Sequence, residues 1–239
     1  SIMFEELNLS KKEVLNAALI SNKAYSDTDN DVSLYISGDG VHFEKKQYFD
    51  VDGTEGVIYY DVTDQTLYVA FRGTSGMKDI STDINILGKK FLNTKAHRGF
   101  VEAFEEVKPI LEDVLKTLLT GKHGIKKIIV SGHSLGGALA QLGYLYMYVN
   151  YKTKLDELGV THALVTFGSP KLFHARTIDT TLTNIFGRTL RVTHADDVVP
   201  TLPKYSSFLK KIFKIEYVHL GQHYDVGNKD EDGSLKEHK

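Results

Sequence analysis

The spacing of apolar residues predicts two amphipathic helices in the first half of the chain. Over residues 9–25 and 99–119, apolar side chains recur every three or four positions, which is the period of one helix face. Ser10 and Glu13 stand three residues apart at the start of the first segment, the spacing of a capping box. The second segment contains Pro109, where we expect a kink.

Shorter apolar runs rich in β-branched and aromatic residues predict strands. Residues 56–62 and 65–71 are two such runs separated by a turn, which indicates an antiparallel hairpin. Further along, strand-like and helix-like runs alternate, with strands at 126–130, 162–168 and 188–194 and helices at 135–150 and 175–186. Strands alternating with helices predict an α/β fold whose central, mostly parallel sheet carries helices on both faces.

One short segment also carries chemistry. Residues 132–136, GHSLG, place Ser134 between the strand at 126–130 and the helix that follows. In this G-x-S-x-G spacing the glycines lack the Cβ atoms that would clash in a sharp strand-to-helix turn, and the serine projects from the carboxyl edge of the sheet. The first amides of the helix have no partner within it, so the N–H of Leu135 is available to an oxyanion. Ser134 is therefore the candidate nucleophile.

Composition narrows the class of protein. The chain has 239 residues, 41% of them hydrophobic, which suits a single domain spanning residues 1–239. With a formal net charge of −2, the chain lacks the excess of positive charge that is typical of nucleic-acid-binding proteins, so we expect no nucleic-acid partner. Because the chain has no cysteine, it has neither disulfides nor a catalytic thiol.

The sequence leaves the compartment open. No segment has the length and apolar character of a membrane-spanning helix, and the first residues do not resemble a signal peptide. The chain begins with Ser1, so removal of a leader would make the protein secreted; otherwise we expect it in the cytoplasm. Nothing in the sequence points to assembly, and a monomer is the default expectation.

Five blocks of the sequence belong together: AFRGT at 70–74, HRGF at 97–100, VSGHSLGGALA at 130–140, TFGSPK at 166–171 and RVTHADDVVPTLP at 191–203. In their order and approximate spacing they resemble the class 3 lipase family of α/β-hydrolases. The resemblance covers roughly residues 57–203, with a weaker tail that reaches His223. It implies an α/β-hydrolase fold with a short helical lid, and a serine carboxylic-ester hydrolase that works through an acyl-enzyme.

The resemblance also implies a catalytic triad. Ser134 matches the family nucleophile, and Asp197 matches the triad acid in preference to the neighbouring Asp196. The chain order of α/β-hydrolases, serine then aspartate then histidine, restricts the base to the late histidines. We favour His238, which looks like the late histidine of the family, with His223 as the alternative.

A third late histidine, His219, lies in a block that precedes the base in the family. Together with His223 and Asp225 it would offer three metal ligands, but Gly221 argues against a helix that would align the two histidines. We therefore expect no metal. A serine triad requires no cofactor either.

Two further elements follow from the resemblance. Thr74 would supply the second oxyanion donor beside Leu135. Residues 75–91 occupy the lid position, and their apolar residues recur every three or four positions, which predicts a short amphipathic flap over an acyl groove. These apolar positions are Met77, Ile80, Ile84 and Leu87. The flap would open at a lipid–water interface; a helix that never moves is the alternative.

A basic, apolar segment covers residues 204–217. Its lysines are interleaved with phenylalanine, leucine and isoleucine, a composition that suits an anionic interface beside the mouth of the site. We favour the simpler interpretation of a helix or hairpin with a solvated lysine face, because clustered lysines are usually plain surface.

Together these features predict a lipase-like esterase that binds lipid or another ester as substrate. Acylglycerols are the first expectation, with phospholipase A1-type, feruloyl-type and soluble esters as alternatives. A different class stays open as well, namely a catalytically silent lipase-like domain that binds lipid or a protein.

Overall fold

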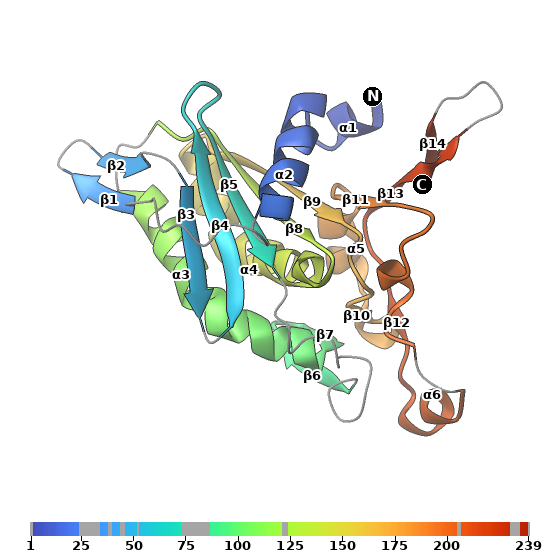
Figure 1. Cartoon of the computed structure of the whole chain (residues 1–239). Helices are drawn as coiled ribbons and strands as arrows, with labels where there is room; N and C mark the ends of the chain where they lie inside the picture. The colour runs from blue at the N-terminus through green and yellow to red at the C-terminus, as the bar shows by residue number, and fades with distance from the viewer. Residues whose placement is uncertain are drawn as a thin grey trace.

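An eight-stranded sheet forms the centre of the protein, in a computed structural model that describes residues 2–23, 34–37, 40–43, 46–51, 53–72, 87–120, 124–204, 207–229 and 235–238 (Figure 1). The strand order is β14-β13-β11-β9-β8-β5-β4-β3. In chain order the strands are β3 (Lys46–Val51), β4 (Thr54–Asp61), β5 (Thr66–Arg72), β8 (Lys127–His133), β9 (Thr161–Phe167), β11 (Leu190–Thr193), β13 (Gln222–Lys229) and β14 (Leu235–His238).

The middle of this sheet is parallel. Neighbouring strands from β5 to β13 pair in parallel, whereas β3 and β4 at one end and β14 at the other pair antiparallel. The mostly parallel sheet predicted from the alternating pattern is confirmed. Because parallel strands share a direction, their carboxyl ends meet at one edge, where the following loops can gather functional side chains.

Helices cover both faces of the sheet (Figure 1). One face carries α1 (Ile2–Glu6) and α2 (Lys11–Lys23), and the other carries α3 (Arg98–Thr120), α4 (Leu135–Glu157) and α5 (Thr180–Phe186). Successive strand residues point to opposite faces, so Ile129 of β8 packs with the α1–α2 layer while Ile128 and Val130 pack with the α3–α4 layer. Each of these side chains is fully buried, which stabilises the fold by roughly 1.5–3 kcal/mol apiece.

Most elements predicted from hydrophobic spacing are present. The helices α2, α3 and α4 and the β4–β5 hairpin occupy the predicted segments, and α3 continues without a break through Pro109. The helix expected over 175–186 is wrong in its first part, where η3 (Ala175–Thr177) is a short 3-10 turn and α5 begins only at Thr180. Asp179 is the reason, because its Oδ1 accepts the N–H of Leu182 at 2.8 Å and caps the helix there.

A smaller sheet is built from the segments that join the main elements. Its order is β12-β10-β7-β6, with β6 (Gly88–Phe91), β7 (Thr94–His97), β10 (Phe173–His174) and β12 (Tyr217–Val218). The predicted helical lid at 75–91 is therefore wrong for its last four residues, because Gly88–Phe91 pairs with β7 as a strand. Residues 75–86 lie outside the described residues.

The remaining elements are short. They are the hairpin β1 (Leu34–Ser37) and β2 (Gly40–Phe43), the 3-10 turn η4 (Val199–Thr201) and the helix α6 (Ser207–Phe213). Over the part of the chain that the structure describes, no helix combines the length and apolar character needed to cross a membrane.

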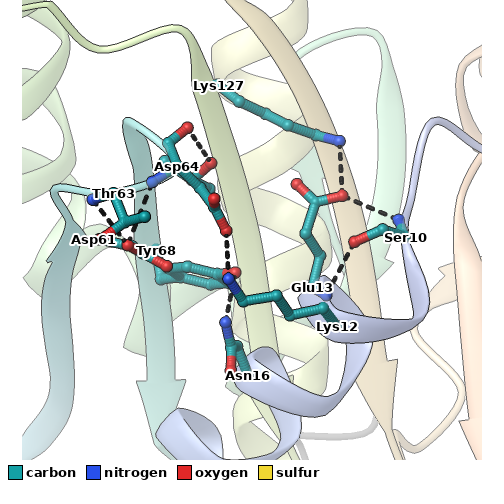
Figure 2. A network of polar contacts seen from close by, with 10 residues as sticks. Ser10, Lys12, Glu13, Asn16, Asp61, Thr63, Asp64, Tyr68 and Lys127 are labelled. Atoms are coloured by element: carbon teal, nitrogen blue, oxygen red, sulfur yellow. Dashed lines mark hydrogen bonds and ion pairs between the residues drawn. The ribbon is translucent and has the colours of Figure 1, made fainter.

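Polar contacts hold α2 on the sheet (Figure 2). Ser10 and Glu13 form the predicted capping box, in which the N–H of Glu13 donates to Ser10 Oγ at 3.0 Å and the N–H of Ser10 donates to Glu13 Oε1 at 2.8 Å. The same carboxylate pairs with Lys127 of β8 at 3.0 Å, and these two side chains are only 13% and 14% exposed. A second pair, Lys12 with Asp64 at 2.8 Å, is 61% and 39% exposed. Glu13 therefore joins the helix cap to the sheet.

Glu13→Ala is expected to lower the free energy of unfolding by about 2–3 kcal/mol, because it removes the acceptor of the Ser10 N–H and leaves the Lys127 ammonium without its carboxylate. Asp64→Ala is the matched control, since it breaks only the exposed pair with Lys12 and should cost less than about 1 kcal/mol. Urea denaturation of both variants at neutral pH measures the difference. Equal losses in the two variants would contradict the role assigned to Glu13.

Candidate active site

Ser134 occupies the turn between β8 and α4. β8 ends at His133 and α4 begins at Leu135, so a single residue reverses the direction of the chain. Its φ of 56° lies in the left-handed region, with ψ at −127°. For a residue with a side chain this backbone conformation is strained, and it persists only where the surrounding packing imposes it. The strand, turn and helix expected around Ser134 are all present.

Two glycines allow the packing that imposes this turn. A Cβ built on Gly132 would lie 2.1 Å from the carbonyl oxygen of Gly136, and a Cβ on Gly136 would lie 2.1 Å from the carbonyl oxygen of Phe71 at the end of β5. Both distances are far below van der Waals contact, and both obstacles are backbone atoms that cannot rotate away. The first turn of α4 can therefore rest directly on β5 and β8 only if both positions are glycine.

The end of β9 completes the support of the turn. The N–H of Ser134 donates to the carbonyl oxygen of Phe167 at 2.7 Å, which fixes the serine backbone to this strand. The next residue, Gly168, has a φ of +64°, and a Cβ there would lie 2.4 Å from Asp197 Oδ2. Ser134 and Asp197 therefore both lie against the carboxyl end of β9, although they are far apart in the sequence.

The two neighbouring aspartates differ sharply in environment. Asp197 is partly buried, and its Oδ1 accepts the N–H of Val199 at 3.0 Å. The side chain of Asp196 is 93% exposed, and its Oδ2 lies 3.9 Å from Nδ1 of His194, a surface pair. Only Asp197 faces the edge of the sheet that carries Ser134. This geometry favours Asp197 over Asp196 as the triad acid, as the resemblance implies.

The charge of Asp197 also reaches His133, the residue before Ser134. Burial lowers the pKa of His133, and the negative charge of Asp197 opposes this shift. Asp197 therefore lies close enough to the turn at Ser134 for its charge to act on His133.

The structure does not bring either candidate base to Ser134. In the register of the sheet, His223 of β13 stands beside Arg191 of β11, and His238 of β14 stands beside His223. At about 4.8 Å per strand, four strand spacings separate β14 from β8, about 19 Å in all. His223 lies one spacing closer, and its Nε2 is 2.5 Å from Thr193 Oγ1. The β13–β14 pairing is irregular between Tyr224 and Lys229.

Partly buried His219 and buried Arg191 are groups that motif reasoning did not assign to the site. His219 Nε2 lies 2.6 Å from the carbonyl oxygen of Pro200, which can only accept, so this ring nitrogen carries a proton and donates. Burial, and next the Arg191 charge, lower the pKa of His219 to about 3. Burial also lowers the pKa of Arg191 to about 10, so its guanidinium remains charged at neutral pH. A neutral His219 thus anchors the turn that follows Asp197.

The remaining predicted residues divide into two groups. Thr74, Met77, Ile80 and Ile84 lie outside the described residues. Leu87 is described, and it packs against Ile215 and Tyr217 beside the smaller sheet. Leu135 is the first residue of α4, where no side-chain cap is found at Ser134. Among the residues that the structure describes, no group of three or more histidines and carboxylates is arranged to hold a metal.

The family of the chain follows from comparison with known proteins. A family model for Lipase (class 3) matches residues 68–207. The chain belongs to the class 3 lipase family. The match begins in β5 and ends at the start of α6, so it contains Ser134 and Asp197 but not His223 or His238.

Curated relatives of this class 3 lipase family member carry lipase names. A secreted mono- and diacylglycerol lipase 1 of Fusarium solani is 34% identical over 164 residues, which cover 64% of this chain and 45% of that protein. A lipase of Rhizopus niveus is 32% identical over 159 residues, covering 64% of this chain and 38% of the relative. The chain thus spans less than half the length of these two relatives.

Solved structures establish the fold. Lipase II from Rhizopus niveus superposes with a TM-score of 0.65 at 23% identity, covering 91% of this chain and 81% of that one. A mutant form of MDLA from Penicillium cyclopium superposes with a TM-score of 0.68 at 20% identity, covering 97% and 87%. This class 3 lipase family member has the α/β-hydrolase fold.

The low pKa of His219 predicts acid sensitivity. In the unfolded chain this ring takes up a proton near its ordinary pKa of 6.5, whereas in the folded protein it stays neutral down to about 3. The unfolded state therefore binds more protons in this window, and the free energy of unfolding falls as the pH falls, by up to about 1.4 kcal/mol per pH unit for this residue. The pKa values of the partly buried His133 and His162 are lowered too, and these residues act in the same direction.

His219→Gln should flatten this pH dependence below pH ~6.5, because glutamine does not titrate and its side-chain amide can still donate to Pro200. Denaturant midpoints measured from pH ~7 to pH ~5 test it. His194→Gln, at an exposed position, controls for loss of a histidine. An unchanged slope in His219→Gln would rule out the buried neutral state.

Proposed function

We propose that this chain is a serine carboxylic-ester hydrolase that acts on acylglycerols. The observation that supports the proposal is the left-handed backbone conformation of Ser134. Close packing of backbone on backbone holds it, and this packing requires glycine at positions 132 and 136 because a Cβ at either would clash. This conformation holds the serine Oγ outward at the carboxyl edge of a parallel sheet. A merely capping serine needs no such strain.

The proposed reaction begins with attack of Ser134 Oγ on the ester carbonyl carbon. The oxyanion that forms accepts the N–H of Leu135, at the positive end of the α4 dipole. Thr74 is the second donor by resemblance to the family. In support of that assignment, Arg72, two residues earlier in the chain, lies against Gly136: its Cα would be 2.9 Å from a Cβ built on that glycine. The alcohol leaves, and water hydrolyses the acyl-enzyme by the same route.

Asp197 is the proposed acid that orients the base, and His238 is the proposed base. His238 lies on the edge strand β14, so this role requires the segment after β13 to leave its irregular pairing and return toward Asp197. His223 remains the alternative, one strand closer and bonded to Thr193. Either histidine must act as acceptor for the Ser134 proton.

Acylglycerol specificity is supported by the name of a relative, the secreted mono- and diacylglycerol lipase of Fusarium solani. Phospholipase A1-type and feruloyl-type or other soluble esters remain alternatives within the same chemistry. A catalytically silent lipid-binding or protein-binding domain is the alternative of another class. The strained turn at Ser134 weighs against it, because a silent domain has no use for that strain.

Ser134→Ala is expected to reduce kcat for p-nitrophenyl esters by at least about 10⁴-fold, because no other group replaces the nucleophile. Circular dichroism and urea unfolding of the variant should match the wild type. Esters from acetyl to palmitoyl define the chain-length preference of the wild type. If Ser134→Ala retained full activity, the mechanism would be wrong; if wild-type protein hydrolysed no ester, the silent domain would be favoured.

Two matched pairs of variants identify the acid and the base. Asp197→Asn should lower kcat by about 10³–10⁴-fold, whereas Asp196→Asn should leave it within a factor of about two, because its carboxylate is in solvent. His238→Ala should abolish turnover and His223→Ala should not. Loss of activity in His223→Ala alone would move the base to β13.

A further inference from the structure

The α6 region carries a surface for which the catalytic proposal has no use. Phe208 and Ile212, one helical turn apart, are 68% and 54% exposed. Every lysine of the same segment is exposed as well. We call these residues the α6 patch, which consists of Lys204, Phe208, Lys210, Lys211, Ile212 and Lys214.

The exposed apolar side chains distinguish this patch from a simple solvated lysine face. A single exposed apolar residue is ordinary, but here a phenylalanine and an isoleucine on one side of a short helix both face water. Burial of a phenylalanine or isoleucine side chain in a core stabilises a protein, and Phe208 and Ile212 do not contribute this free energy because they are exposed. The helix therefore presents a short apolar strip on its exposed side.

Positive charge surrounds the strip. A hollow of about 390 Å³ beside α6 is lined by four cationic side chains and one carboxylate, namely Arg176, Lys210, Lys211, Lys214 and Glu216, together with Ile215. Lys210 lies 3.8 Å from Glu216. The whole chain has a formal net charge of −2, so this excess of positive charge is local. It complements an anionic partner.

The patch lies at the same end of the molecule as the candidate active site. β10 follows the carboxyl end of β9, and it pairs with β12 just after α6. The N–H of Ala175 donates to the carbonyl oxygen of Glu216 at 2.8 Å, which fixes the end of the patch there. Val198, directly after Asp197, is 65% exposed at this edge. Figure 1 shows α6 projecting beyond β12, on the side of the molecule that carries β6 and β7.

We propose that the α6 patch docks the protein on an anionic lipid surface. Phe208 and Ile212 enter the boundary between headgroups and acyl chains, while the long lysine side chains extend to the headgroup anions. The inference rests on the proposed function in one respect: an acylglycerol hydrolase releases fatty-acid carboxylates, which make its own substrate surface anionic. Docking through α6 would hold Ser134 at that surface.

Vesicle binding tests this directly in the Ser134→Ala protein, which cannot consume the lipid. We expect it to sediment with phosphatidylcholine vesicles containing phosphatidylglycerol, weakly with phosphatidylcholine alone, and less at high salt. Adding Lys211→Glu and Lys214→Glu should weaken binding at least about 30-fold, since each lysine at an anionic surface contributes roughly a five-fold gain. Phe208→Ala should weaken it about ten-fold.

Matched controls alter the same chemistry elsewhere. Lys11→Glu with Lys154→Glu makes the same change of charge at exposed positions on α2 and α4, and Leu15→Ala removes another exposed apolar side chain. Both controls should bind vesicles as the parent does. Equal binding to neutral and anionic vesicles, or equal losses in controls and α6 variants, would overturn the proposal. So would capture of an acidic protein or nucleic acid without any vesicle binding.

The design separates this inference from the proposed function. Lys211→Glu with Lys214→Glu in the wild-type background should hydrolyse soluble p-nitrophenyl acetate at the parental rate. If that ester is turned over but the Ser134→Ala protein ignores vesicles, the docking surface is wrong and the hydrolase stands. If no ester is hydrolysed but vesicle binding depends on α6, the hydrolase fails and the docking surface stands.

Discussion

The arrangement around Ser134 depends on how closely α4 approaches the ends of β5 and β8. Backbone meets backbone there, with Gly136 against the carbonyl of Phe71 and Gly132 against the carbonyl of Gly136. The strain of a left-handed serine is of the order of 1–3 kcal/mol and must be offset by other interactions. The helix supplies them, because all of its residues from Gly136 to Met147 are buried. The core therefore holds the serine in a conformation that the local sequence alone would not adopt.

The two edges of the parallel sheet have different roles. At the amino edge, charged groups pair with each other, as Glu13 does with Lys127, and fasten α2 to the sheet (Figure 2). At the carboxyl edge, Asp197 accepts the backbone N–H of Val199 and lies over Gly168, with the turn at Ser134 beside it. A neutral, partly buried His219 anchors the following turn through Pro200 without adding charge. A carboxylate supported in this way is suited to orient an imidazole.

The loops that follow β9 and β11 contribute both to the candidate site and to the surface beside it. They provide Gly168 and Asp197 to the candidate site, and they continue into β10, η4 and α6, which build the surface beside it. Leu87, expected in the lid, packs against Ile215 and Tyr217 in this same region. The smaller sheet thus joins the segment before α3 to the segment after α6.

Local sequence determined a large part of this picture. Hydrophobic period and the Ser10–Glu13 cap predicted α2 and the β4–β5 hairpin, because each depends on contacts between residues close in the chain. The G-x-S-x-G spacing predicted the place of the turn at Ser134, but its conformation is held by contacts with Phe71 and Phe167, which are distant in the sequence. Only the tertiary structure showed that Asp197 is partly buried against Gly168 whereas Asp196 is exposed, since the two residues share a sequence environment and differ in what lies across from them. It alone showed that residues 88–91 form a strand and that Phe208 and Ile212 face water, because strand pairing and exposure depend on distant partners. The position of His238 opposite His223 is likewise a matter of sheet order, which no local pattern encodes.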